Sequence, residues 1–241
     1  MKRVLSISIL IVSLMCGQVF AATNLSLFDL SGSVIEGGVQ ESPYHRNMTE
    51  LKKEINKLGK ADSILVLGFG KKSDVVLLKA TMPNMGGPMN RNLIGTKEAA
   101  IKKLQENITN KARNIDNSKT DVIGGIFRAV RLFNDFQDQK SSGPQVNRLL
   151  IYSDMLDNEN LTLSLNTLKS GDHKKFLRSF ESKNMGYPDL RNVEVNIYCA
   201  FSDIKDLSTA ETEIAIRTLK AFWSEFFSKS SADLKSFRTI Y

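Results

Sequence analysis

The distribution of apolar positions along the chain predicts strands and helices in alternation. Five short runs have the character of β-strands: Leu25–Asp29, Ser63–Phe69, Val75–Met82, Arg148–Ser153 and Val193–Phe201. The run Ser63–Phe69 is apolar throughout, which is typical of a central strand covered on both faces. A turn over Gly70–Asp74 separates it from the next run, so these two strands are expected to form a hairpin.

Four longer segments show the helical spacing of apolar residues. They are Met48–Lys60, Lys97–Ile115, Val122–Phe136 and Thr209–Ser228. Strands separated by helices predict an α/β domain of three layers. Its sheet would be doubly wound and mostly parallel, with one antiparallel edge strand supplied by the hairpin. Leu161, Leu163 and Leu165 alternate with other residues, which leaves an additional strand open there.

The first 21 residues have the organisation of a secretory signal peptide. Met1-Lys2-Arg3 is basic, Val4–Met15 is apolar apart from serines, and Val19-Phe20-Ala21 carries the small residues of a cleavage site. The apolar run is shorter than the roughly 20 residues that span a bilayer. We expect cleavage near Ala21, a periplasmic or secreted protein, and a single domain over residues 22–241 that does not insert stably into a membrane.

The two cysteines lead to different expectations. Cys16 lies inside the predicted signal, but a lipoprotein signal would need a small residue in place of Met15 and leucine in place of Ser13. Lipidation is therefore rejected, and cleavage leaves Cys199 as the single thiol of the mature chain. Because Cys199 lies in an apolar run, we expect it in the core rather than at a reactive site.

Composition and charge exclude several classes of protein. The 241 residues are 41% hydrophobic and 24% charged, which is ordinary for a globular protein and unlike collagen or a disordered chain. The formal net charge is +7, but basic residues are spread along the chain, so we expect no nucleic-acid partner. No phosphate loop occurs, and the two histidines, His45 and His173, lie in polar surroundings.

Oxygen-bearing side chains gather in three segments. Asp29, Ser31 and Ser33 follow the first predicted strand. Thr120 precedes a helix, and Asp154 follows the fourth predicted strand. In the expected topology all three segments meet at one edge of the sheet, where α/β folds bind their ligands. Oxygen ligands of this kind suit Mg²⁺, Mn²⁺ or Ca²⁺ rather than Zn²⁺.

These segments resemble the metal-ion-dependent adhesion site of von Willebrand factor type A domains. Asp29-x-Ser31-x-Ser33 is similar to the opening of that motif, Thr120–Gly125 to its threonine loop, and Ser153-Asp154 to its late aspartate. The resemblance extends over about residues 24–228. The sequence departs from the family at Met155, where glycine is usual.

The resemblance implies a Mg²⁺ site, with Mn²⁺ or Ca²⁺ as alternatives. Ser31, Ser33 and Thr120 would be hydroxyl ligands, bound directly or through water. Asp29 and Asp154 would act mainly through water or from behind the ligands. In this family the Asp or Glu of a partner protein often completes the coordination of the cation.

The function expected from the resemblance is metal-dependent binding of a protein partner, in adhesion or in assembly at a bacterial envelope. One alternative is a metal-free type A scaffold subunit of an envelope, secretion or conjugation complex. Another is a metal-dependent phosphoesterase that uses Asp29 and Asp154. We expect no enzyme, because neither histidine is placed as a catalytic base.

Two further residues or segments belong to the expected site. Ser118 is an alternative to Thr120 as the hydroxyl of the middle segment. The basic turn Lys71-Lys72 should lie at the same edge of the sheet, because the hairpin turns there. It could steer an acidic partner toward the site, but the alternative, that the two lysines only keep the turn solvated, is the more expected one for these residues.

Overall fold

The structure of the protein is a computed structural model. It describes residues 22–31, 42–71, 74–84, 90–111, 118–138, 147–201 and 207–240. The predicted signal peptide, Ser33 and Lys72 lie outside the described residues.

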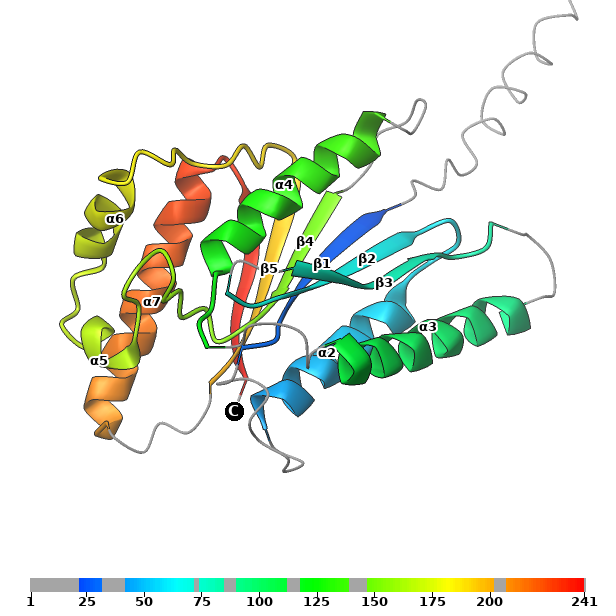
Figure 1. The fold of residues 1–241 in the computed structure, drawn as a ribbon, viewed down its shortest axis with the longest axis horizontal. Helices are drawn as coiled ribbons and strands as arrows, with labels where there is room; N and C mark the ends of the chain where they lie inside the picture. The colour runs from blue at the N-terminus through cyan, green and yellow to red at the C-terminus, as the bar shows by residue number, and fades with distance from the viewer. Residues whose placement is uncertain are drawn as a thin grey trace, which may run out of the picture.

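One sheet runs through the middle of the molecule (Figure 1). Within the described ranges its strands are β1 (Thr23–Asp29), β2 (Ser63–Phe69), β3 (Asp74–Thr81), β4 (Asn147–Tyr152), β5 (Val193–Ala200) and β6 (Asp233–Ile240). The strand order is β3-β2-β1-β4-β5-β6. All neighbours are parallel except β2 and β3, which form the expected antiparallel hairpin. The predicted sheet, mostly parallel with one antiparallel edge strand, is confirmed.

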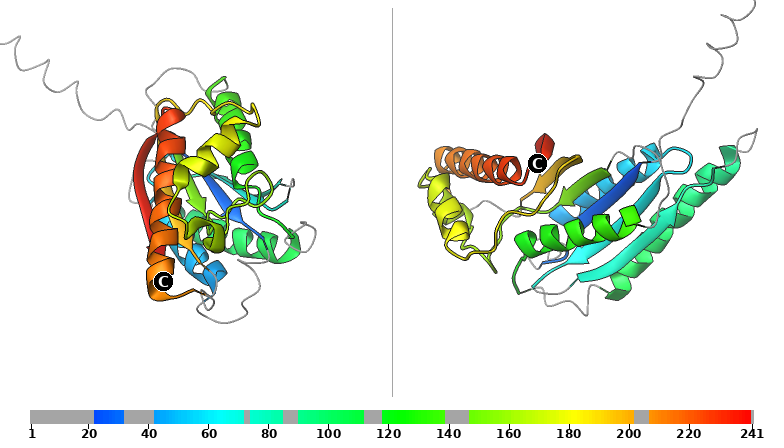
Figure 2. Two further views of the ribbon diagram at one scale, coloured as in Figure 1. Left: turned by 90° about the vertical axis from the view of Figure 1, so that its left-hand side faces the viewer. Right: turned by 90° about the horizontal axis from the view of Figure 1, so that it is seen from above.

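Helices cover both faces of this sheet, as Figures 1 and 2 show. They are α2 (Pro43–Lys57), α3 (Asn90–Lys111), α4 (Val122–Asp138), α5 (Leu165–Leu168), α6 (His173–Glu181) and α7 (Thr209–Lys229). The helices α2 and α3 pack on one face, whereas α4, α5, α6 and α7 pack on the other. The three-layer α/β architecture predicted from the sequence is therefore confirmed.

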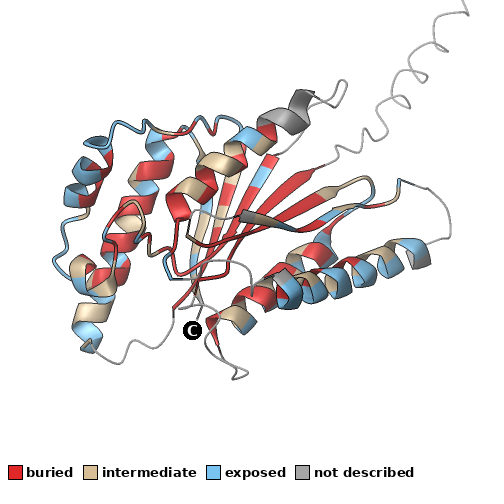
Figure 3. Cartoon of the chain, viewed as in Figure 1, coloured by how far each residue is buried: buried red, intermediate tan, exposed pale blue. Residues whose placement is uncertain are grey.

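Two hydrophobic cores lie on the two faces of the sheet, because side chains alternate along each strand. Leu25 and Leu27 of β1 are buried in the core beneath α4 and α7, whereas Phe28 is buried beneath α2 and α3. Trp223 of α7 and Cys199 of β5 are both fully buried in the first core, as expected for Cys199. Figure 3 shows buried positions, in red, along the strands and along the sheet-facing sides of the helices.

The structure decides the question that the sequence left open between β4 and β5. No additional strand forms at Leu161, Leu163 and Leu165 in this described stretch, and Leu165 instead begins the short helix α5. The reason is that the N–H groups of Leu161 and Leu163 bond to the carboxylate and the carbonyl of Asp157 rather than to a neighbouring strand.

Other elements also differ from the prediction. The helix α6 and the edge strand β6 are both additional to the elements expected from the sequence. The helix α2 spans Pro43–Lys57 rather than Met48–Lys60, and α3 begins at Asn90 rather than at Lys97. Among the described helices, none combines the length and the hydrophobicity that a membrane span requires.

Candidate functional site

Five parallel strands, β1, β2, β4, β5 and β6, end at one edge of the sheet, here called the carboxyl edge. The strand β1 ends at Asp29 and β2 at Phe69, and these two residues are paired in the sheet. The strands β4 and β5 end beside them at Tyr152 and Ala200. Lys71 follows β2 at this edge, as the sequence predicted. Every polar group that follows one of these strands is therefore near the place where such folds bind ligands.

The carboxylate of Asp29 organises the end of β1 and is fully buried. Its Oδ1 accepts a hydrogen bond of 2.8 Å from the backbone N–H of Ser31. Its Oδ2 accepts a hydrogen bond of 2.7 Å from the hydroxyl of Ser153. Burial raises the pKa of Asp29, and these two hydrogen bonds oppose the shift. Asp29 thus fixes the turn to Ser31 and ties the end of β1 to the end of β4.

Asp154 begins the loop after β4 and is also buried. Its Oδ1 accepts a hydrogen bond of 3.0 Å from the backbone N–H of Leu156. Its carbonyl oxygen accepts one of 3.3 Å from the thiol of Cys199 on β5. The position of Asp154 at the edge is therefore held from both its side chain and its backbone.

Met155 gives this loop the backbone shape that glycine would normally supply. Its φ is 61°, in the left-handed region where a side chain is strained by about 1–2 kcal/mol. Two contacts offset that strain: the Met155 side chain is fully buried, and its carbonyl accepts a 3.0 Å hydrogen bond from the indole Nε1 of Trp223. Met155 therefore supplies a glycine-like turn at the position where the type A resemblance predicts glycine.

Thr120 lies buried just before α4 and is bonded to the loop after β4 through its backbone. Its N–H donates to Oδ1 of Asn158 at 2.7 Å. Its carbonyl accepts hydrogen bonds from the N–H groups of Asn158 at 3.1 Å and Glu159 at 3.3 Å. Ser118, the alternative hydroxyl, is exposed. Thr120 is thus the residue of this segment that is fixed beside the Asp154 loop.

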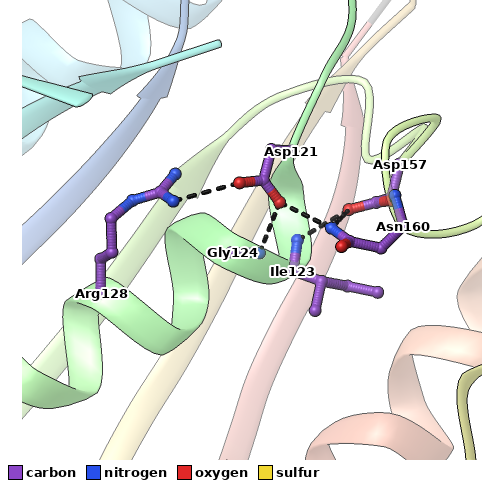
Figure 4. A network of polar contacts seen from close by, with 6 residues as sticks. All are labelled: Asp121, Ile123, Gly124, Arg128, Asp157 and Asn160. Atoms are coloured by element: carbon purple, nitrogen blue, oxygen red, sulfur yellow. Dashed lines mark hydrogen bonds and ion pairs between the residues drawn. The ribbon is translucent and has the colours of Figure 1, made fainter. Parts of the chain in front are cut away.

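Asp121 caps α4 and joins it to the same loop (Figure 4). Its Oδ1 accepts hydrogen bonds of 2.8 Å from the N–H of Gly124 and of 2.6 Å from the side-chain amide of Asn160. Its Oδ2 lies 3.1 Å from the guanidinium of Arg128, one further turn along the helix. The carboxylate of Asp121 therefore caps α4, forms an ion pair with Arg128 and accepts a hydrogen bond from the loop after β4.

Asp157 is a second fully buried carboxylate near the edge. It accepts hydrogen bonds from the backbone N–H groups of Ile123 at 2.9 Å, Asn160 at 2.8 Å and Leu161 at 3.0 Å. The side-chain amide of Asn160 adds a contact of 3.3 Å. Burial raises the pKa of Asp157, and these donors oppose the shift. Asp157 therefore links the first turn of α4 to the loop after β4.

The structure brings most of the predicted site residues to the carboxyl edge. Those placed there are Asp29, Ser31, Thr120 and Asp154. The remaining predicted ligand, Ser33, lies outside the described residues. Asp29 and Ser31 are in direct hydrogen-bond contact, and Ser153 connects them to Asp154.

The donor groups at this edge fit a hard cation, because they are hydroxyl and carboxylate oxygens. Both oxygens of Asp29 already accept hydrogen bonds, which fits a place behind the ligands rather than among them. Across the described ranges, no group of three or more His, Cys, Asp and Glu side chains is arranged to hold a metal ion. The assignment of ligands stays a prediction.

Three residues that connect the loop after β4 to the start of α4 were not predicted from the sequence: Asp157, Asn158 and Asn160. A run of Asp, Asn and Glu is typical of any surface turn. The partners of these residues lie 34 to 39 positions earlier in the chain, where no local spacing rule applies. The available signal was their location, directly after a buried strand that ends at the ligand-binding edge.

No protein-family model and no curated protein sequence matches the chain. Solved structures with a similar fold include proximal thread matrix protein 1 from the mussel byssus, at 13% identity and a TM-score of 0.45, over 88% of this chain and 48% of that one. The manganese-loaded TRAP protein of Plasmodium vivax matches at 14% identity and a TM-score of 0.42, over 81% of this chain and 62% of that one. A von Willebrand factor type A structure from Catenulispora acidiphila matches at 13% identity and a TM-score of 0.39, over 84% and 43%.

The chain spans between 43% and 62% of the length of these three structures. With TM-scores below 0.5, the likenesses do not by themselves assign the chain to a family. The fold implied by the type A resemblance is confirmed by the strand order and by the antiparallel edge strand β3.

Proposed function

We propose that this chain is an exported protein-binding module that engages a partner through a divalent cation at the carboxyl edge. Ser31, Ser33 and Thr120 are the proposed hydroxyl ligands, and Asp29 and Asp154 stand behind them or act through water. The observation that carries the proposal is the 2.7 Å bond from Ser153 to Asp29, which joins two of the three loops into one unit.

The chemistry of the donor set determines the kind of partner. Hydroxyl groups are neutral, and both oxygens of Asp29 are engaged by protein donors. A bound cation would keep part of its positive charge at the edge, because its proposed direct ligands are neutral hydroxyl groups and the carboxylates act from behind or through water, and this charge attracts an anion from outside. The proposed occupant of the remaining coordination position is therefore the carboxylate of an Asp or Glu on a partner protein. Mg²⁺ is the expected ion, with Mn²⁺ or Ca²⁺ as alternatives.

Export belongs to the same proposal. The basic, apolar and small-residue order of residues 1–21 supports removal of a signal near Ala21 and a periplasmic or secreted location. Mass spectrometry of the protein recovered from the periplasm should give a mature chain that begins at Ala22. Recovery of the chain with Met1 from the cytoplasm alone would contradict it.

Metal binding is tested by thermal unfolding with and without millimolar Mn²⁺ or Mg²⁺. A cation that binds the native state alone stabilises it by about 2.7 kcal/mol at 100 times its dissociation constant. The wild type should gain stability, whereas Ser31→Ala and Thr120→Val should gain little. Ser26→Ala is the matched control, because Ser26 is a buried serine of β1 away from the edge. A melting curve insensitive to the ions and to EDTA would contradict the proposal.

Partner binding is tested by capture from an envelope extract. Wild-type protein with Mg²⁺ should retain a protein that is lost with EDTA or with Ser31→Ala, while Ser26→Ala retains it. Capture that is indifferent to EDTA and to Ser31→Ala would favour the metal-independent scaffold instead.

A further inference from the structure

We infer that Asp157 and Asn160 are positioning residues of the cation site, which hold Thr120 at a fixed place relative to Asp154. This inference rests on the proposed function. Neither residue is a proposed ligand. They act through the backbone of the threonine segment and through the first turn of α4.

The backbone of Thr120 is bonded to the loop after β4 from two sides. Its N–H donates to the side chain of Asn158, and its carbonyl accepts the N–H groups of Asn158 and Glu159. Two neighbouring residues of the loop thus determine where Thr120 lies. A shift of this part of the loop has to carry Thr120 with it.

Asp157 sets the shape of that part of the loop. Its Oδ1 accepts the backbone N–H groups of Asn160 and Leu161, which closes the chain from 157 to 161 into a tight turn. Its Oδ2 accepts the N–H of Ile123 in the first turn of α4. The carboxylate of Asp157 therefore connects the loop to the helix that Thr120 precedes. It lies only three positions after Asp154.

Asn160 makes a second connection between the same two elements. Its side-chain amide donates to Asp121 at 2.6 Å and approaches Asp157 at 3.3 Å, so a neutral group lies between two carboxylates (Figure 4). Asp121 is the residue directly after Thr120. The threonine segment is thus held by Asn158 on its backbone and by Asn160 on the adjoining side chain.

Part of the capping of α4 is independent of Asp157 and Asn160, because Asp121 caps the helix through the N–H of Gly124 and Arg128 balances its charge. Asp157 adds a cap on the N–H of Ile123. A fully buried carboxylate is costly unless donors surround it, and Asp157 has donors from both elements. In addition, Asp157 and Asn160 fix the distance between the segment that carries Thr120 and the loop that carries Asp154.

The test is a double-mutant cycle on Mn²⁺ affinity, measured by calorimetry on the wild type, Asp157→Asn, Thr120→Val and the double variant. Outer partners of metal ligands typically change affinity by about 10- to 100-fold when mutated. Asp157→Asn should weaken Mn²⁺ binding by about that factor in the wild-type background. In the Thr120→Val background it should weaken binding little further, because the hydroxyl that it positions is absent. The same factor in both backgrounds would overturn the inference.

Two controls separate positioning from loss of stability and from failure of the proposed function. Asp172→Asn changes the exposed cap of α6 and should leave Mn²⁺ affinity unchanged. If Asp157→Asn does not fold, Asn160→Ala takes its place in the cycle, and it should likewise weaken Mn²⁺ binding. In the metal-free protein, Asp157→Asn should accelerate hydrogen exchange at the Thr120 amide, and unchanged exchange would overturn the inference. Wild-type protein that binds no Mn²⁺ would overturn both proposals, whereas normal binding by Asp157→Asn would overturn this one alone.

Discussion

The hydroxyl of Ser153 donates a hydrogen bond of 2.7 Å to the buried carboxylate of Asp29, across 124 positions of the chain. The two residues stand at the ends of the neighbouring strands β4 and β1. The same hydroxyl accepts the backbone N–H of Met155 at 2.9 Å. A single serine therefore stabilises a buried charge and shapes the turn that follows β4.

Ser153→Ala should be strongly destabilising, because it leaves Asp29 with one donor fewer in a fully buried place. Hydrogen bonds to charged groups contribute about 1.5–3 kcal/mol, and a loss of this size is expected in urea denaturation. Ser26→Ala is the matched control. The Ser26 hydroxyl is buried without a hydrogen-bond partner among the described residues, so its loss should change stability by less than about 0.5 kcal/mol or increase it. Equal effects of the two changes would contradict this account.

Two adjacent glycines at the start of α4 should respond in opposite ways to alanine. A Cβ at Gly124 would collide with both carboxylate oxygens of Asp121, which Asn160 and Arg128 hold in place. Gly124→Ala should displace the cap and cost about 1–2 kcal/mol, the usual cost of losing a helix N-cap. A Cβ at Gly125 would meet Phe69 at an ordinary 3.6 Å.

Gly125→Ala should therefore be neutral or stabilising by up to about 1 kcal/mol, because alanine favours the helix. Thermal unfolding of Gly124→Ala and Gly125→Ala compares the effect on stability of the same substitution at two adjacent positions of one helical turn. A stable Gly124→Ala protein would show that the Asp121 carboxylate moves away at little cost.

A pair of stacked tyrosines beneath α2 offers a third matched comparison. The rings of Tyr152 and Tyr198 lie 4.9 Å apart and nearly parallel. The Tyr152 hydroxyl is buried and makes no hydrogen bond within the described ranges, whereas the Tyr198 hydroxyl donates to Glu54 at 2.9 Å. Tyr152→Phe should stabilise the protein by about 1 kcal/mol, and Tyr198→Phe should destabilise it by about 1 kcal/mol.

Urea denaturation of the two variants checks these signs, since both preserve the ring stacking. A loss of stability in Tyr152→Phe would mean that its hydroxyl has a partner in solution, such as bound water.

Cys199 should be inert to thiol reagents in the native protein. Its thiol is fully buried and donates to the carbonyl of Asp154, and burial raises its pKa well above the ordinary value of 9.0. The thiolate is thus absent at pH 8.5, and labelling should require unfolding. The raised pKa also means that this group favours the native state less as pH rises above about 9, its unfolded value.

Labelling in increasing urea checks this prediction, with Cys199→Ser as the control for any other reactive thiol. Reaction of the native protein at the rate of a free thiol would contradict the burial of Cys199.

Strong local patterns allowed most of the sheet to be predicted from the sequence. The run Ser63–Phe69 is buried on both faces and its limits are those of β2. The edge strand β6 was missed because its residues are only partly buried and its register against β5 shifts between Val195 and Asn196, which interrupts the alternation. The helix α6 had a usable signal in the spacing of Phe176, Leu177 and Phe180.

For the candidate site, only the common location of the proposed ligands Asp29 and Asp154 could be predicted from the sequence. Asp29 and Asp154 follow apolar strands, so their common edge follows from topology alone. Asp157 and Asn160 could not be assigned roles, because their partners are supplied by α4 through tertiary contacts. The left-handed backbone of Met155 was equally hidden, since it depends on burial of that side chain and on the indole of Trp223.

The central strand β1 pairs on one side with β4, which comes much later in the chain. It lies between β2 and β4, and Thr23 pairs with Asn147, so the middle of the sheet cannot close until the chain through β4 has been synthesised. Pairing over such separations slows folding, because loop-closure entropy has to be overcome before the contacts form. A nascent chain that folds late stays open to the machinery that moves unfolded polypeptides across a membrane. In the proposed export, the strand order would itself help to keep the protein translocation-competent until it has crossed.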